Sequence, residues 1–113
     1  MESHFDRKTE ARETEMFPGF MARFVHSERM TVAHWRIQAG NVVPEHAHPH
    51  EQIVNCLSGR FEMTVGDETV VMEAGDVAVV PPNVPHKALA ITDCFCLDIF
   101  TPVREDYRVE PTA

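Results

Sequence analysis

Short runs of β-branched and aromatic residues, separated by Gly, Pro, Asp and Asn, make up the chain from residue 16 onward. No segment keeps an apolar period of 3.6 residues over the length of a helix, and short runs of this kind are typical of strands. The pair Gly66-Asp67 between two of them predicts a two-residue hairpin turn. Antiparallel strands at even spacing favour a barrel or a jelly roll. The sequence therefore predicts an all-β fold, with strands at 20–26, 30–38, 51–57, 60–65, 68–73, 77–80, 86–91 and 94–100.

The length and composition indicate a single folded domain. The chain has 113 residues, of which 43% are apolar and 25% are charged, so it is long enough for one core and too apolar for a disordered protein. Residues 1–15 mix both signs of charge with few large apolar side chains. We expect a mobile arm over this segment and the barrel over residues 16–113.

The charge and the cysteines restrict the partners and the location. A formal net charge of -8 argues against nucleic acid, because affinity for a polyphosphate comes mainly from Lys and Arg. No apolar run reaches the roughly 18 residues of a membrane span, and the first residues are charged where a signal peptide would be apolar. Three cysteines are too few for a disulfide framework, so we expect a cytoplasmic protein with Cys56, Cys94 and Cys96 as core thiols. Metal chelation by Cys94 and Cys96 is the alternative.

Two of the expected strands are apolar on both faces. They are DVAVV at 76–80 and CFCLDIF at 94–100, whereas a sheet with one wet face alternates apolar and polar residues. The outer face of this sheet is therefore expected to pack on a second copy of the chain, forming a homodimer. In the alternative, the N-terminal arm covers that face.

Three of the seven histidines fall within the stretch PEHAHPHEQ. Residues two apart on an extended strand point to the same side, so His46 and His48 can direct their rings at one point inside a barrel. A third ligand a few residues later and a fourth from another strand would complete a site of imidazoles and an oxygen donor. Such a site suits one divalent metal ion, and zinc, nickel, manganese and iron all remain open.

This spacing resembles the first motif of the cupin family, which is Gly, five residues, His-x-His, three or four residues, Glu, six residues and Gly. The second motif is Gly, five residues, Pro-x-Gly, two residues, His, three residues and Asn. Fifteen residues, 60–74, separate the two motifs here. The resemblance implies a double-stranded β-helix, or jelly-roll barrel, in one domain, with His46, His48, Gln52 and His86 as metal ligands. The matching segments are Gly40-NVVPE-His46-Ala47-His48-PHE-Gln52-IVNCLS-Gly59 and Gly75-DVAVV-Pro81-Pro82-Asn83-VP-His86-KAL-Ala90.

The chain departs from the cupin motifs at Gln52, Asn83 and Ala90. Asn83 replaces a turn glycine, and Asn tolerates a left-handed backbone better than most residues. Gln52 replaces the usual Glu, so three neutral imidazoles and an amide would leave the full +2 charge on the metal and favour Lewis-acid chemistry over redox chemistry. Glu51 is the alternative ligand, but its side chain should point to the opposite face. For His50 we expect a surface or supporting role.

The segments HPHEQ, SGRFEMTVGDE, PPNVPH and 97–107 resemble the KdgF family of small cupins, over about residues 40–107. In that family, the enzyme opens the ring of a 4,5-unsaturated galacturonate or guluronate from pectin or alginate breakdown, giving the linear keto form. The resemblance implies catalytic roles for Asp98, Phe100 and Arg104. It also implies a small anionic sugar as the substrate.

The residue types suit this chemistry. Asp98 and Phe100 are two apart and can both face the cavity, where Asp98 could shuttle a proton and Phe100 could shape the wall. Arg104 could hold the substrate carboxylate in a two-point fork. The structural alternatives are a solvated charge run for Arg104, a structural carboxylate for Asp98 and a core position for Phe100. The alternative functions are a metal-dependent cupin dioxygenase and a non-catalytic sugar-binding cupin.

Overall fold

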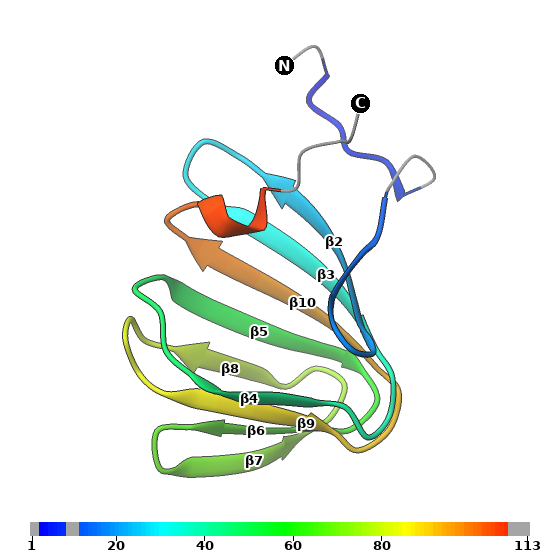
Figure 1. Cartoon of the computed structure of the whole chain (residues 1–113), viewed down its shortest axis with the longest axis vertical. Helices are drawn as coiled ribbons and strands as arrows, with labels where there is room; N and C mark the ends of the chain where they lie inside the picture. The colour runs from blue at the N-terminus through cyan, green and yellow to red at the C-terminus, as the bar shows by residue number, and fades with distance from the viewer. Residues whose placement is uncertain (1–2, 9–11, 109–113) are drawn as a thin grey trace.

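The computed structural model describes residues 3–8 and 12–108, which form two antiparallel sheets. The larger sheet has the strand order β1-β2-β3-β10-β5-β8, and the smaller one has the order β4-β9-β6-β7. Figure 1 shows the strands of both sheets, with the 3-10 turn Glu105–Tyr107 beside the ends of β2, β3 and β10. The strands are β1 (Thr14–Phe17), β2 (Phe20–His26), β3 (Thr31–Ile37), β4 (Val42–His46), β5 (Glu51–Ser58), β6 (Phe61–Val65), β7 (Glu68–Met72), β8 (Val77–Val80), β9 (His86–Ala90) and β10 (Cys94–Thr101).

The predicted all-β fold is confirmed, and two strands were missing from the prediction. All eight predicted runs form strands, and Val65 pairs with Glu68, so Gly66-Asp67 is the expected hairpin turn. The missing strands are β1 and β4. Strand β4 contains Pro44, which lacks the backbone N–H that strand pairing uses, and the strand pairs irregularly with β9 between Val43 and His46.

Strand β10 positions the centre of the site. It lies between β3 and β5 in the larger sheet, and its residues alternate between the interior and the outer face. Alternation with a period of two places Asp98 and Phe100 on the interior side, together with Cys94 and Cys96. These two thiols are buried and free, as expected for core residues.

The N-terminal segment contacts the larger sheet. Strand β1 begins at Thr14, two residues before the expected start of the barrel, because Thr14–Phe17 pairs with the start of β2. Asp6 forms an ion pair with Arg23 on β2, and Glu13 forms one with Arg36 on β3. The expected arm, 1–15, includes residues 1–2 and 9–11, which lie outside the described residues, and its mobility stays a prediction.

The outer face of the larger sheet carries exposed apolar side chains. Leu57, Val77, Val79 and Phe95 each have more than half of their surface exposed, at 54%, 55%, 58% and 52%. Cross-strand pairs continue this surface across five strands, as a row of aliphatic residues: Val79, Ile53, Ile99, Val32 and Val25. The homodimer stays a prediction, and this exposed apolar face is where its contact would lie.

Changing this face is expected to change the oligomeric state. A lysine in place of Val79 would bring a charge into a dry interface, so Val79→Lys is expected to shift a dimer toward monomers in sedimentation velocity. The matched control is Val42→Lys, at a valine of similar exposure, 54%, on the smaller sheet. An unchanged mass for both variants would place any dimer contact elsewhere.

Candidate metal centre and its cavity

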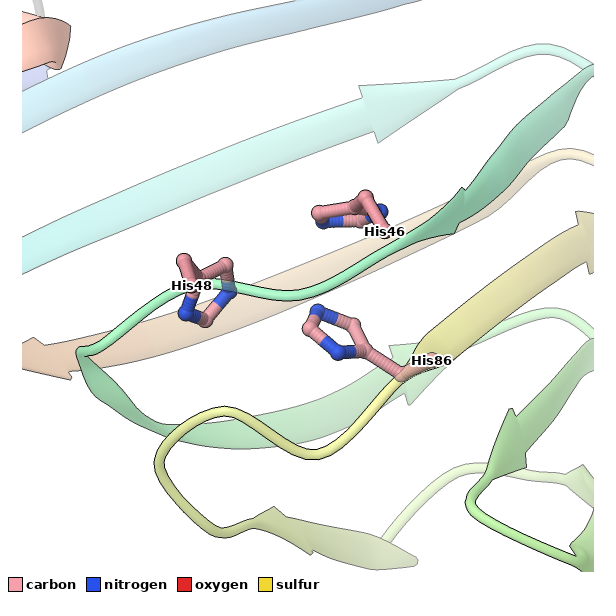
Figure 2. A group of neighbouring side chains, drawn as sticks. All are labelled: His46, His48 and His86. Atoms are coloured by element: carbon pink, nitrogen blue, oxygen red, sulfur yellow. The ribbon is translucent and has the colours of Figure 1, made fainter.

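Three histidines converge between the two sheets at one end of the barrel. His46 on β4 pairs directly with His86 on β9, and their ring centroids lie 4.2 Å apart. His48 follows β4 in the chain, and its ring centroid lies 4.7 Å from that of His86. One nitrogen from each ring lies within 4.8 Å of the others, and Figure 2 shows the three rings facing a common point. The cluster that the spacing predicted is therefore present, and it could bind a metal.

Each of these histidines is fixed in one tautomer by a backbone carbonyl. A carbonyl oxygen can only accept, so the ring nitrogen beside it, Nδ1, must carry the proton. In a neutral ring this leaves Nε2 with a free lone pair, which is the form that binds a metal. The Nδ1–H groups of His46, His48 and His86 donate to the carbonyls of Pro44, His50 and Val84, over 2.9, 3.0 and 2.9 Å.

His86 shows the strongest preference for the neutral form. Burial lowers the pKa of its ring to about 4, so at neutral pH the ring carries no charge. Its Nε2 is buried and has no hydrogen-bond partner among the described residues. A buried lone pair without a donor is costly unless a ligand satisfies it, so this atom fits a metal ligand.

Gln52 brings an oxygen donor to the cluster from the other sheet. Its side chain on β5 is 7% exposed, whereas that of Glu51 is exposed, so the two point to opposite faces as expected. The Oε1 atom of Gln52 lies 3.0 Å from His48 Nε2. Because Nδ1 of His48 holds the proton in the neutral ring, both of these atoms present lone pairs. Two ligands of one ion, each bound at about 2.1 Å and at a right angle, lie about 3 Å apart. The residues therefore fit one divalent metal ion.

Asp98 lies behind Gln52 and is buried. It is 7% exposed, and its Oδ2 accepts a hydrogen bond of 2.9 Å from Gln52 Nε2. Burial raises the pKa of this carboxyl to about 7, although hydrogen bonds from Gln52 and Trp35 and the charge of Arg104 act to lower it. A group with a pKa near the operating pH can both accept and donate a proton.

Arg104 is also buried, at 6% exposure, so it does not belong to a solvated charge run. Its Nε and Nη2 donate to the Asp106 carboxylate over 2.9 and 2.7 Å. The guanidinium carbon lies 3.9 Å from the centroid of the Tyr107 ring and 4.7 Å from that of Phe100.

The expected two-point fork of Arg104 needs a refinement, because one edge of the guanidinium already binds Asp106. The other edge, formed by Nη1 and the second proton of Nη2, is the one left for a ligand, and Nη1 is buried without a partner among the described residues.

Thr31 anchors the backbone of Arg104. Its hydroxyl oxygen, in a side chain with 0% exposure, accepts a hydrogen bond of 2.9 Å from the Arg104 backbone N–H. The ring of His26 lies 2.8 Å from the same hydroxyl through Nδ1, which gives His26 a structural role. Thr31 belongs to no motif, so nothing in the sequence indicated its role. Asp106 and Tyr107 lie in the segment 97–107 that resembles KdgF, but the resemblance implied no role for them.

Removing the Thr31 hydroxyl is expected to destabilise the protein. In Thr31→Val, the buried N–H of Arg104 would lose its acceptor, and the free energy of unfolding should fall by about 1–3 kcal/mol. Denaturant unfolding would measure this. The control is Thr69→Val, the same exchange at an exposed position of β7, for which a change within about 0.5 kcal/mol is expected. Equal effects in both variants would contradict the anchoring role.

One cavity brings most of the predicted site residues together. Its polar lining includes Lys87 and the predicted residues His46, Gln52, His86, Asp98 and Arg104, and Phe100 forms part of its wall. His48 is not among the lining residues but contacts Gln52 from the side. The apolar part of the lining includes Phe17, Phe20, Trp35, Ile37, Phe61 and Met63.

Comparison with known proteins identifies the family. Residues 33–100 match the family described as Cupin domain. This chain is a cupin. Two solved structures are similar to it over 94% of its length, each with 27% sequence identity. They are an RmlC-like cupin from Shewanella frigidimarina, with a TM-score of 0.89 over 96% of that chain, and KdgF from Halomonas sp., with a TM-score of 0.88 over 99% of that chain.

A curated relative extends the comparison to a named isomerase. The H2HPP isomerase of Bacillus subtilis is 50% identical over 54 residues, which are 47% of this cupin and 22% of that protein.

The structural similarity to KdgF from Halomonas sp. confirms the resemblance to KdgF that the sequence indicated. Within the described part of the cupin, no helix is long and apolar enough to cross a membrane.

Proposed function

We propose that this cupin opens the ring of 4,5-unsaturated uronates to their linear keto form, as a metal-dependent isomerase or lyase-type enzyme. The observation that carries the proposal is the placement of a buried carboxyl, a buried guanidinium edge and a histidine cluster around one cavity. The structural likeness to KdgF supports the proposal, because the resemblance of residues 40–107 to that family implies action on unsaturated uronates.

Arg104 supplies the charge that an anionic substrate needs. The protein carries a formal net charge of -8, so a carboxylate entering the cavity requires a local cation. The free edge of Arg104 offers parallel N–H groups that match the two oxygens of a carboxylate. Asp106 and the ring of Tyr107 hold the guanidinium in place, so little side-chain entropy is lost on binding.

Asp98 is proposed to move the proton. Ring opening removes a proton from the anomeric hydroxyl, breaks the bond between the anomeric carbon and the ring oxygen, and delivers a proton to the enol carbon, so the product is an isomer of the substrate. A carboxyl with a pKa of about 7 can do both in turn at neutral pH. A divalent metal on His46, His48, His86 and Gln52 would supply Lewis-acid stabilisation of the oxygen charge that develops.

A related isomerisation is the second candidate. The identity of 50% to the H2HPP isomerase over 54 residues, which are 22% of that protein, favours it. The substrate that is turned over distinguishes the two candidates.

The deciding experiment follows ultraviolet absorbance after a polysaccharide lyase has generated unsaturated galacturonate. The metal-loaded protein should speed the loss of the double-bond absorbance, and the protein treated with a chelator should not. A parallel reaction contains H2HPP instead. Turnover of H2HPP alone would replace the uronate proposal with the second candidate. Oxygen consumption with another substrate, and no effect on either test compound, would favour the dioxygenase alternative.

A further inference from the structure

Gln52 lies between the histidine cluster and Asp98 and contacts both. Its Oε1 is 3.0 Å from His48 Nε2, and its Nε2 donates to Asp98 Oδ2 over 2.9 Å. An amide side chain presents an oxygen lone pair on one side and an N–H donor on the other. A carboxylate offers acceptors alone. A donor toward Asp98 is thus a property that Gln52 has and that an ionised Glu would lack.

The register of the sheet fixes this contact. Gln52 pairs with Phe100, and Val54 pairs with Asp98, so Gln52 and Asp98 are diagonal neighbours on adjacent strands β5 and β10. Both side chains point to the interior and are 7% exposed. The amide and the carboxyl are thus brought together by the backbone pairing of β5 with β10.

The two oxygens of Asp98 consequently have different surroundings. Oδ2 is engaged by Gln52, whereas Oδ1 is buried and accepts no hydrogen bond of standard geometry among residues 3–8 and 12–108, although the buried indole N–H of Trp35 acts on the same carboxyl and lowers its pKa. A carboxyl held by one oxygen presents the other in a defined direction, which a proton transfer requires.

We propose that Gln52 is a positioning residue for Asp98. Its side-chain N–H holds Oδ2, and Oδ1 exchanges the proton with the substrate, taking it from a hydroxyl and returning it to carbon. This inference rests on the proposed function. It also gives a reason for Gln at a motif position where cupins usually have Glu: a carboxylate there would face Oδ2 of Asp98 with no donor between them.

The first test uses metal-free protein at pH 8 and measures thermal unfolding. Gln52→Glu is expected to lower the midpoint by about 5 °C or more, because it removes the buried amide donor to Asp98 and places a second carboxyl group beside it. The double variant Gln52→Glu/Asp98→Asn reverses the donor and acceptor, and should restore most of the loss. The matched control is Gln38→Glu, which adds the same charge at an exposed position and should leave the midpoint unchanged.

The second test measures metal content and steady-state kinetics on unsaturated galacturonate. Gln52→Glu should keep its metal, because a carboxylate is also a good ligand. Its kcat is expected to fall by a factor of about 100 or more, with KM within about threefold, since Asp98 does not bind the substrate carboxylate. Gln38→Glu should match the unaltered protein.

Two outcomes would overturn the inference. One is a midpoint for metal-free Gln52→Glu equal to that of Gln38→Glu, and the other is a metal-loaded Gln52→Glu variant with an unchanged kcat. A failure of the proposed function gives a different pattern: the unaltered protein is inactive on the uronate. The thermal comparison with the double variant would still decide whether Gln52 and Asp98 are coupled.

Discussion

Replacing Asp98 with Asn is expected to slow ring opening by a factor of about 100 to 10,000, which is the range for the loss of a general acid or base. An amide has nearly the shape of the carboxyl but cannot act as a general acid or base at neutral pH. The metal content should remain unchanged, because Asp98 is not among the proposed ligands. Kinetics on unsaturated galacturonate and elemental analysis of the same preparation would measure both quantities.

The control for this variant is Asp67→Asn, which removes one carboxylate from the exposed β6–β7 turn. Its activity should equal that of the unaltered protein. A loss of metal in Asp98→Asn would show that the carboxyl belongs to the metal site itself. Full activity in this variant would remove Asp98 from the mechanism.

Replacing His86 with Ala is expected to weaken metal binding by a factor of at least about 100, and with it the activity. Loss of a residue that only supports a ligand already costs a factor of about 10 to 100 in affinity, and His86 presents its own buried Nε2 to the cluster. Titration of the chelator-treated protein with zinc, followed by calorimetry, would give the affinity.

His34→Ala is the matched control, because His34 lies on β3 in the larger sheet and outside the cluster. Its metal affinity should be unchanged. If both variants bound metal equally well, the histidine cluster would not be the metal site.

The sequence predicted those strands whose residues carry a strand pattern of their own. Strands β1 and β4 escaped, for different reasons. Thr14–Phe17 is short and follows a charged segment, and it becomes a strand only by pairing with β2. Strand β4 contains a proline and mainly exposed residues, so neither its propensity nor its pattern indicates a strand. In both cases tertiary pairing decided the local structure.

The same distinction applies to the site. The two-residue spacing of His46 and His48 shows that both rings can point one way, so the cluster was predictable from local geometry. The contact between Thr31 and Arg104 joins residues 73 positions apart in the chain, and no local pattern specifies it. The pairing of Arg104 with Asp106 is local, but a charged sequence of this kind is equally typical of a solvated turn. Only the burial of Arg104 against the Tyr107 ring distinguishes this pair from a solvated turn.

The proposed ligands come from both walls of the barrel, since β4 and β9 belong to the smaller sheet and Gln52 to the larger one. An ion at this position would cross-link the two sheets at one end of the barrel. Amide hydrogen exchange in β4, β5 and β9 should then slow together when metal is added, while β7, at the edge of the smaller sheet, should exchange as before. Loading with metal would in this way govern how often the barrel opens, in addition to the chemistry inside it.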